Sequence, residues 1–150
     1  MCDYSLQHVA SRPAMVGDEL LTSRFFGTAT LGFVCARQPA ACLHGVAVCL
    51  RPGTELVFDG EAEYRRSVRP WLPLFSFAKS AGKVAVFRQV EMDNPHRHHD
   101  ALEFPDGTVV PLTHLRVGQR ARVLQLPAEP EPAKSRAEAE NRPVPAELVD

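Results

Sequence analysis

Three of the chain's six histidines lie close together in the stretch NPHRHHD, residues 94–100. Side chains two apart on an extended segment point to the same side, and imidazoles with a carboxylate suit zinc, iron, copper or nickel. Glu103 follows this bend closely, and His114 comes on the returning segment. The spacing predicts a divalent transition metal, and a surface bend rich in histidine is the open alternative. The candidate ligands are His96, His98, His99, Glu103 and His114.

The segment from His96 to Glu103 resembles the first motif of the cupin family, His-x-His-x4-Glu. Cupins are antiparallel β-barrels that bind a metal. The resemblance implies a metalloenzyme in which His96, His98 and Glu103 converge inside a barrel and leave one coordination position for substrate. Val90 stands where the motif begins with glycine, and Gly107 comes three residues too early for its last glycine.

The four cysteines, Cys2, Cys35, Cys42 and Cys49, follow no zinc-ribbon or ferredoxin spacing. The N-terminus has no basic segment followed by an apolar run, so we expect no signal peptide and a cytoplasmic location. In that reducing compartment the cysteines are predicted to be thiols or ligands rather than disulfides.

Cys2 would become the N-terminal residue if Met1 were removed. It then resembles the N-terminal nucleophile of class II glutamine amidotransferases and of the abasic-site crosslinking family. The resemblance implies a hydrolase in which the α-amino group activates the thiol. In both families glycine follows the cysteine, whereas Asp3 follows here.

Strand patterns recur about every ten residues, separated by glycine, proline and aspartate. Clear examples are 31–35, 84–90 and 118–126, the last with Ala121 and Val123 alternating with arginines. Residues 45–58 read as a hairpin around Pro52-Gly53, and 61–69 as the best short helix. We therefore predict a mainly β fold: one compact antiparallel β-barrel or sandwich with at most one short helix.

The composition changes at Pro127. Residues 127–150 have no aromatic side chain, five prolines, six acidic and three basic residues. Such a segment buries too little apolar area to offset the entropy of ordering. We predict a β domain over 1–126 and a flexible Pro/Glu-rich tail over 127–150.

The aromatic segment Trp71–Phe77 is predicted either to plug the core or, with the tail, to contact a protein partner. The formal net charge of −1 argues against nucleic acid, and no apolar run is long enough for a membrane span. Arg65, Arg66 and Arg69 are interpreted as a solvated face.

Two further stretches resemble known sequences. Residues 112–127, LTHLRVGQRARVLQLP, are similar to the opening of the ferrous-iron transport accessory family, which implies a tightly curved strand. The opening MCDYSL with AVCLRPGTELVF resembles a set of bacterial proteins that carries no established activity. We expect a small non-enzymatic binding or accessory protein, with the metalloenzyme and the Cys2 hydrolase as alternatives.

Overall fold

The computed structural model describes residues 9–25, 30–36, 46–67 and 76–128. Eleven strands lie in these ranges, together with one short 3-10 helix, η3 (Leu112–His114). The strands are β1 (Ser11–Pro13), β2 (Glu19–Arg24), β3 (Leu31–Cys35), β4 (Ala47–Cys49), β5 (Glu55–Phe58), β6 (Glu63–Ser67), β7 (Ser76–Ser80), β8 (Val84–Gln89), β9 (Asp100–Glu103), β10 (Val109–Pro111) and β11 (Arg120–Gln125).

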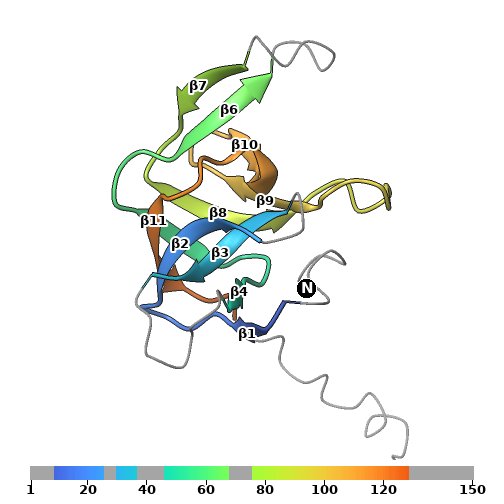
Figure 1. Ribbon diagram of the computed structural model, residues 1–150. Helices are drawn as coiled ribbons and strands as arrows, with labels where there is room; N and C mark the ends of the chain where they lie inside the picture. Colours follow the sequence, from blue (N-terminus) through green and yellow to red (C-terminus); the bar gives the residue numbers. More distant parts are fainter. Residues whose placement is uncertain (1–8, 26–29, 37–45, 68–75, 129–150) are drawn as a thin grey trace, which may run out of the picture.

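Nine strands form one sheet in the order β1-β4-β3-β2-β11-β5-β8-β9-β10, and β6 and β7 form a separate ribbon (Figure 1). Between the described strands all pairs are antiparallel except β1 and β4, so the sheet is mixed. The predicted mainly β fold is confirmed. Within the described ranges the sheet is open, with β1 and β10 at its two edges, and does not close as a barrel.

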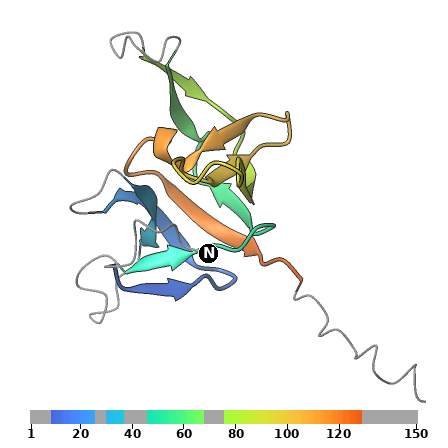
Figure 2. The same cartoon turned by 90° about the vertical axis from the view of Figure 1, so that its right-hand side faces the viewer.

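β11 lies at the centre of the sheet, between β2 and β5 (Figure 2). Its arginines are exposed while Ala121 and Val123 are buried, as the sequence alternation predicts. The core lies beneath it, and its largest fully buried apolar side chains come from five different strands. They are Leu20, Leu56, Leu102, Val110 and Val123.

The predicted helix over 61–69 is wrong, because these residues enter strand β6. Ala62 is fully buried and Tyr64 packs against the core, while Arg65 is exposed. That is the alternation of a strand. β7 pairs with β6 along its whole length and completes the ribbon.

The predicted hairpin over 45–58 is also wrong in its pairing. Both strands form, but β4 pairs with β1 and β3, whereas β5 pairs with β11 and β8. The Pro-Gly turn is present, with Gly53 at a φ of 92°. It is held by Thr54 Oγ1, which donates to Arg51 O at 2.7 Å, and by Gly53 N, which donates to Phe87 O at 2.8 Å. This second bond ties the turn to β8 and so directs the chain across the sheet.

The cysteine prediction holds for Cys35, a half-buried free thiol, and is wrong for Cys49, which is disulfide-bonded. The other two cysteines, Cys2 and Cys42, lie outside the described residues. Which cysteines meet depends on the Cα distances that the fold creates, and spacing along the chain does not give them. Disulfides persist mainly in oxidising compartments, so the cysteines no longer support a cytoplasmic location.

Among the described residues, no helix has the length and apolar character needed to cross a bilayer. The predicted boundary at residue 127 falls just before the undescribed residues 129–150, so the tail prediction lies outside the structure.

Candidate anion-binding cleft

The bend between β8 and β9 spreads its histidines over the surface. It projects from the sheet as a loop (yellow in Figure 1). His96 and His98 are exposed and His99 is half-buried. The ring of His99 has its own contact, since Nδ1 lies 3.0 Å from the carbonyl oxygen of Val90.

The two remaining metal candidates lie elsewhere. Glu103 is at the end of β9 and accepts a hydrogen bond from Arg88 Nε at 2.7 Å. His114 is in η3 and lines a different cavity, among arginines. Of the residues with described positions, no three histidine, cysteine or carboxylate side chains lie close enough to hold a metal ion. Metal binding at the bend thus stays a prediction, and the convergence that a cupin-like site requires is not found.

Backbone contacts give the bend its own shape. Val90 N donates to His99 O at 2.8 Å, and Asn94 N donates to Glu91 O at 3.0 Å. Glu91 has a φ of 51°, in the left-handed region, and its carboxylate accepts from Arg97 at 2.9 Å. This turn separates His96 from β9 and explains why the i, i+2 spacing of an extended strand does not apply to the histidines.

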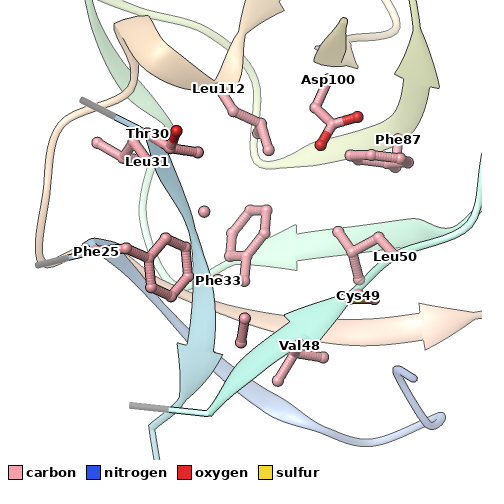
Figure 3. Close-up of a pocket in the computed structure, with 12 residues that line it drawn as sticks. Phe25, Thr30, Leu31, Phe33, Val48, Cys49, Leu50, Phe87, Asp100 and Leu112 are labelled. Atoms are coloured by element: carbon pink, nitrogen blue, oxygen red, sulfur yellow. The ribbon is translucent and has the colours of Figure 1, made fainter. Parts of the chain in front are cut away.

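A small cavity lies between β3, β4 and β8 and is lined mostly by apolar side chains (Figure 3). Phe33, Leu50 and Phe87 contribute to its wall, and Asp100 is the one ionisable residue among the described lining residues. Its volume of about 30 Å³ corresponds to roughly one water molecule. It is a packing space of the core and too small for an organic ligand.

A larger cavity lies at the base of the β6–β7 ribbon, with a volume of about 420 Å³. We call it the basic cleft. It lies within the size range of small-molecule sites. Its described lining residues come from the end of β2, from β6, and from η3 and the turn that follows it. They are Arg24, Arg65, Thr113, His114, Leu115, Arg116 and Val117.

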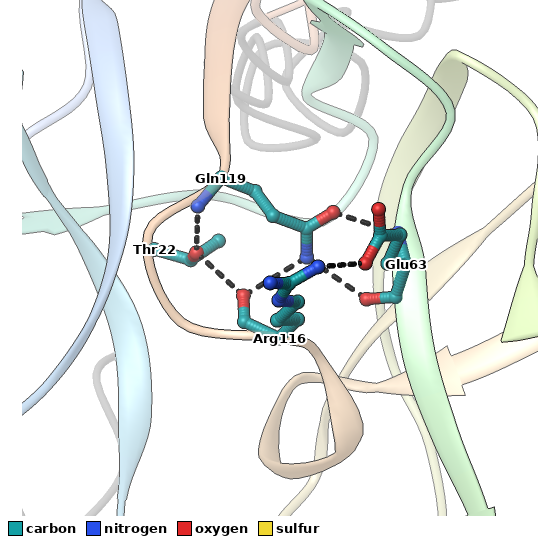
Figure 4. Close-up of polar contacts among 4 residues, drawn as sticks. All are labelled: Thr22, Glu63, Arg116 and Gln119. Atoms are coloured by element: carbon teal, nitrogen blue, oxygen red, sulfur yellow. Dashed lines mark hydrogen bonds and ion pairs between the residues drawn. The ribbon is translucent and has the colours of Figure 1, made fainter. Parts of the chain in front are cut away.

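A hydrogen-bond network holds these segments together (Figure 4). Gln119 connects the nine-stranded sheet to the β6–β7 ribbon. Its Nε2 donates to the carbonyl oxygen of Glu63 at 2.8 Å, and its Oε1 accepts from Glu63 N at 2.6 Å. Thr22, which is fully buried, accepts from Gln119 N and donates to Arg116 O, both at 2.8 Å. Gly118, with a φ of 88°, makes the turn that lets Gln119 reach β6.

The cleft has an excess of positive charge. Arg116 forms an ion pair with Glu63, which also accepts a backbone bond from Arg116 N at 3.0 Å. For Arg24 and Arg65 no ion pair is found with any described residue, and both are exposed. No carboxylate is present among the described residues that line the cavity. This lining attracts anions and repels metal cations, so His114 is poorly placed as a metal ligand.

Sequence reasoning missed this cleft. The sequence pattern gives no role to Arg24, and it indicates only a solvated face for Arg65. The only signal for Arg65 was its arginine neighbours Arg66 and Arg69, and that signal does not say which distant segment faces it. The position of Arg24 opposite β6 depends on the pairing of β2 with β11 and on the Gln119 network.

Several features predicted from the sequence involve residues that the structure does not describe. Cys2 and residues 71–75 of the aromatic segment are not described, and neither are the side chains of Ser76 and Phe77. The hypotheses of a Cys2 nucleophile and of a partner site at Trp71–Phe77 therefore stay predictions.

No protein-family model, curated protein or solved structure matches this chain. A function for this chain must therefore be inferred from the geometry of the described residues.

Proposed function

We propose that this protein is a small non-enzymatic binding protein that holds an anionic ligand in the basic cleft. The observation that carries the proposal is the pair of exposed arginines, Arg24 and Arg65, which face one cavity without a carboxylate partner among the described residues. Guanidinium groups are planar, present several donors, and match the oxygens of carboxylates and phosphates.

The lining favours binding over acid–base catalysis. Arginine stays protonated in proteins and therefore does not act as a general acid or base at neutral pH. What the arginines supply is charge and oriented N–H donors, which bind an oxyanion. The Gln119 network fixes the turn at 116–119 against β6, so one wall of the cleft is already positioned before a ligand arrives.

An accessory role remains part of this proposal. In that role the protein would dock on a larger partner. Trp71–Phe77 and the segment 127–150 supply the sequence features for such a contact.

A thermal-shift experiment tests the proposal. The protein is heated with phosphate, sulfate, citrate or acetate at constant ionic strength, so that general salt screening is equal in all samples. A ligand at about ten times its Kd should raise the midpoint by roughly 4 °C, because it binds only the folded chain. The double variant Arg24→Gln/Arg65→Gln should lose this shift.

Arg51→Gln is the matched control, since Arg51 is exposed in the turn before β5 and does not line the cleft. It removes a positive charge without touching the site and should keep the wild-type shift. The proposal is wrong if no oxyanion stabilises the wild type, or if the double variant responds as the wild type does.

A further inference from the structure

The charge balance of the basic cleft selects a dianion. Of the three arginines in the lining, Arg116 is paired with Glu63, and the remaining two, Arg24 and Arg65, contribute a formal charge of +2. A monoanion would leave half of that charge uncompensated. A phosphomonoester carries about −1.5 to −2 at neutral pH, which matches it.

The donors also match a phosphoryl group in number and kind. Each guanidinium offers several N–H groups in a planar fork, and two such forks can share the three terminal oxygens of a phosphomonoester. Thr113 adds a hydroxyl donor from the lining, and the ring of His114 adds a further nitrogen. Thr113 and His114 are in η3, and Arg24 and Arg65 are at the end of β2 and on β6, so the donors approach from different segments.

The cleft is too large for the phosphoryl group alone. Its volume of about 420 Å³ is typical of sites for organic molecules. Val117 contributes apolar surface to the same lining, and it is 48% exposed although it is a large apolar residue. Covering this surface with an organic group is favourable.

We infer that the ligand of the basic cleft is a small organic phosphomonoester, with its phosphoryl group on Arg24 and Arg65 and its organic portion on Val117. This inference rests on the proposed anion-binding function and names its ligand class. A small molecule fits better than a nucleic acid, because nucleic-acid binding needs basic side chains along several phosphates, and the chain has a net charge of −1.

Isothermal titration at pH 7.5 with three probes tests the ligand class. Phenyl phosphate is a dianion with an organic body, phenyl sulfate has nearly the same shape and one negative charge, and inorganic phosphate lacks the organic body. We expect phenyl phosphate to bind about tenfold more tightly than phenyl sulfate, and several-fold more tightly than inorganic phosphate.

Two variants locate the binding. Arg24→Gln and Arg65→Gln should each weaken phenyl phosphate binding about tenfold or more, since each removes charge-assisted hydrogen bonds. Arg51→Gln should leave the affinity unchanged. Val117→Ser should reduce the preference for phenyl phosphate over inorganic phosphate and leave the affinity for inorganic phosphate as it is.

The outcomes distinguish the phosphomonoester inference from the anion-binding function on which it rests. Equal affinities for phenyl phosphate and phenyl sulfate, both lost in the arginine variants, would overturn the phosphomonoester and keep anion binding. No binding of any probe would overturn the phosphomonoester, and an absent thermal shift with all oxyanions would overturn the function as well. A phosphoserine peptide or an RNA oligonucleotide that bound more than tenfold tighter than phenyl phosphate would also overturn the assignment to a small molecule.

Discussion

The histidine-rich bend and the basic cleft differ in how closeness along the chain relates to closeness in the folded protein. The bend brings conspicuous side chains together along the chain and then spreads them over an exposed turn. The cleft takes inconspicuous arginines from segments far apart in the sequence and places them around one cavity. Proximity in sequence is therefore a poor guide to a site in this fold, because a turn separates neighbours while sheet pairing unites distant residues.

The largest expected effect comes from breaking the network that builds the cleft. Gln119→Ala removes three side-chain hydrogen bonds, two to the backbone of Glu63 and one to Arg116 O. It should lower the free energy of unfolding by about 2–3 kcal/mol, since the partner groups lose their bonds. Chemical denaturation measures this effect, and titration with phenyl phosphate should show weakened binding in the same variant.

Gln125→Ala is the control for this prediction. Gln125 is exposed at the other end of β11 and makes none of these bonds. If the two variants are equally stable, the network does not position the ribbon, and the contrast between an organised cleft and an unorganised bend fails.

Two ion pairs sharpen the comparison because they differ in exposure. Asp18 accepts two hydrogen bonds from Arg12, at 2.8 and 3.0 Å, and its side chain is 13% exposed. Glu91, in the bend, also pairs with an arginine, Arg97, but is 51% exposed. We expect Asp18→Asn to cost about 1–2 kcal/mol and Glu91→Gln less than about 0.5 kcal/mol, because solvent screens the exposed pair.

The stability that the Asp18–Arg12 ion pair provides should depend on pH. Burial acts to raise the pKa of Asp18, but the hydrogen bonds from Arg12 and from Met15 N and the charge of Arg12 outweigh it, so the pKa lies below its ordinary value. The stabilisation is therefore complete above the unfolded-state pKa of about 3.9, and it is lost as the pH falls through the folded-state value. Unfolding measured from pH 6 to pH 2.5 should show a steeper loss for the wild type than for Asp18→Asn. Parallel pH profiles of stability for the two proteins would contradict this prediction.

The strands were predictable because they depend on local pattern. Leu31–Cys35 was expected from the sequence and is β3, and the alternation around Ala121 and Val123 is β11. The helix over 61–69 failed because a short window with Ala62 and Tyr64 fits a period of two as well as a helical turn. Only burial of both side chains against the core decides between them.

Strand partners and the cleft were not predictable, because they depend on contacts between distant segments. β4 lies in an apolar run and precedes a Pro-Gly turn, yet it pairs with β1 and β3 rather than with β5. The cleft depends on such pairing and on a single glutamine. Gln119 is one polar residue in an alternating strand pattern, and nothing in its type or spacing indicates that it reaches Glu63.

One variant should raise the ligand affinity of the basic cleft rather than lower it. Glu63→Gln removes the carboxylate that neutralises Arg116 and should tighten phenyl phosphate binding several-fold, because a third cation becomes available. The cost in stability should stay below about 1 kcal/mol, since the side chains of Arg116 and Glu63 are 66% and 46% exposed and solvent screens the pair. Glu103→Gln breaks a similar exposed pair with Arg88, away from the cleft, and should leave the affinity unchanged. Unchanged binding in both variants would mean that Arg116 does not contact the ligand.

The smallest expected effect comes from the bend itself. His96→Ala should change the free energy of unfolding by less than about 0.5 kcal/mol and leave phenyl phosphate binding unchanged, because His96 is exposed. His114→Ala, the matched change in the cleft, should weaken that binding a few-fold through loss of one hydrogen-bonding nitrogen. Elemental analysis of the same proteins decides whether the histidine-rich bend binds a metal ion. Near-stoichiometric metal in the wild type that disappears in His96→Ala would mean that the bend closes around an ion, and the bend would then be the organised site.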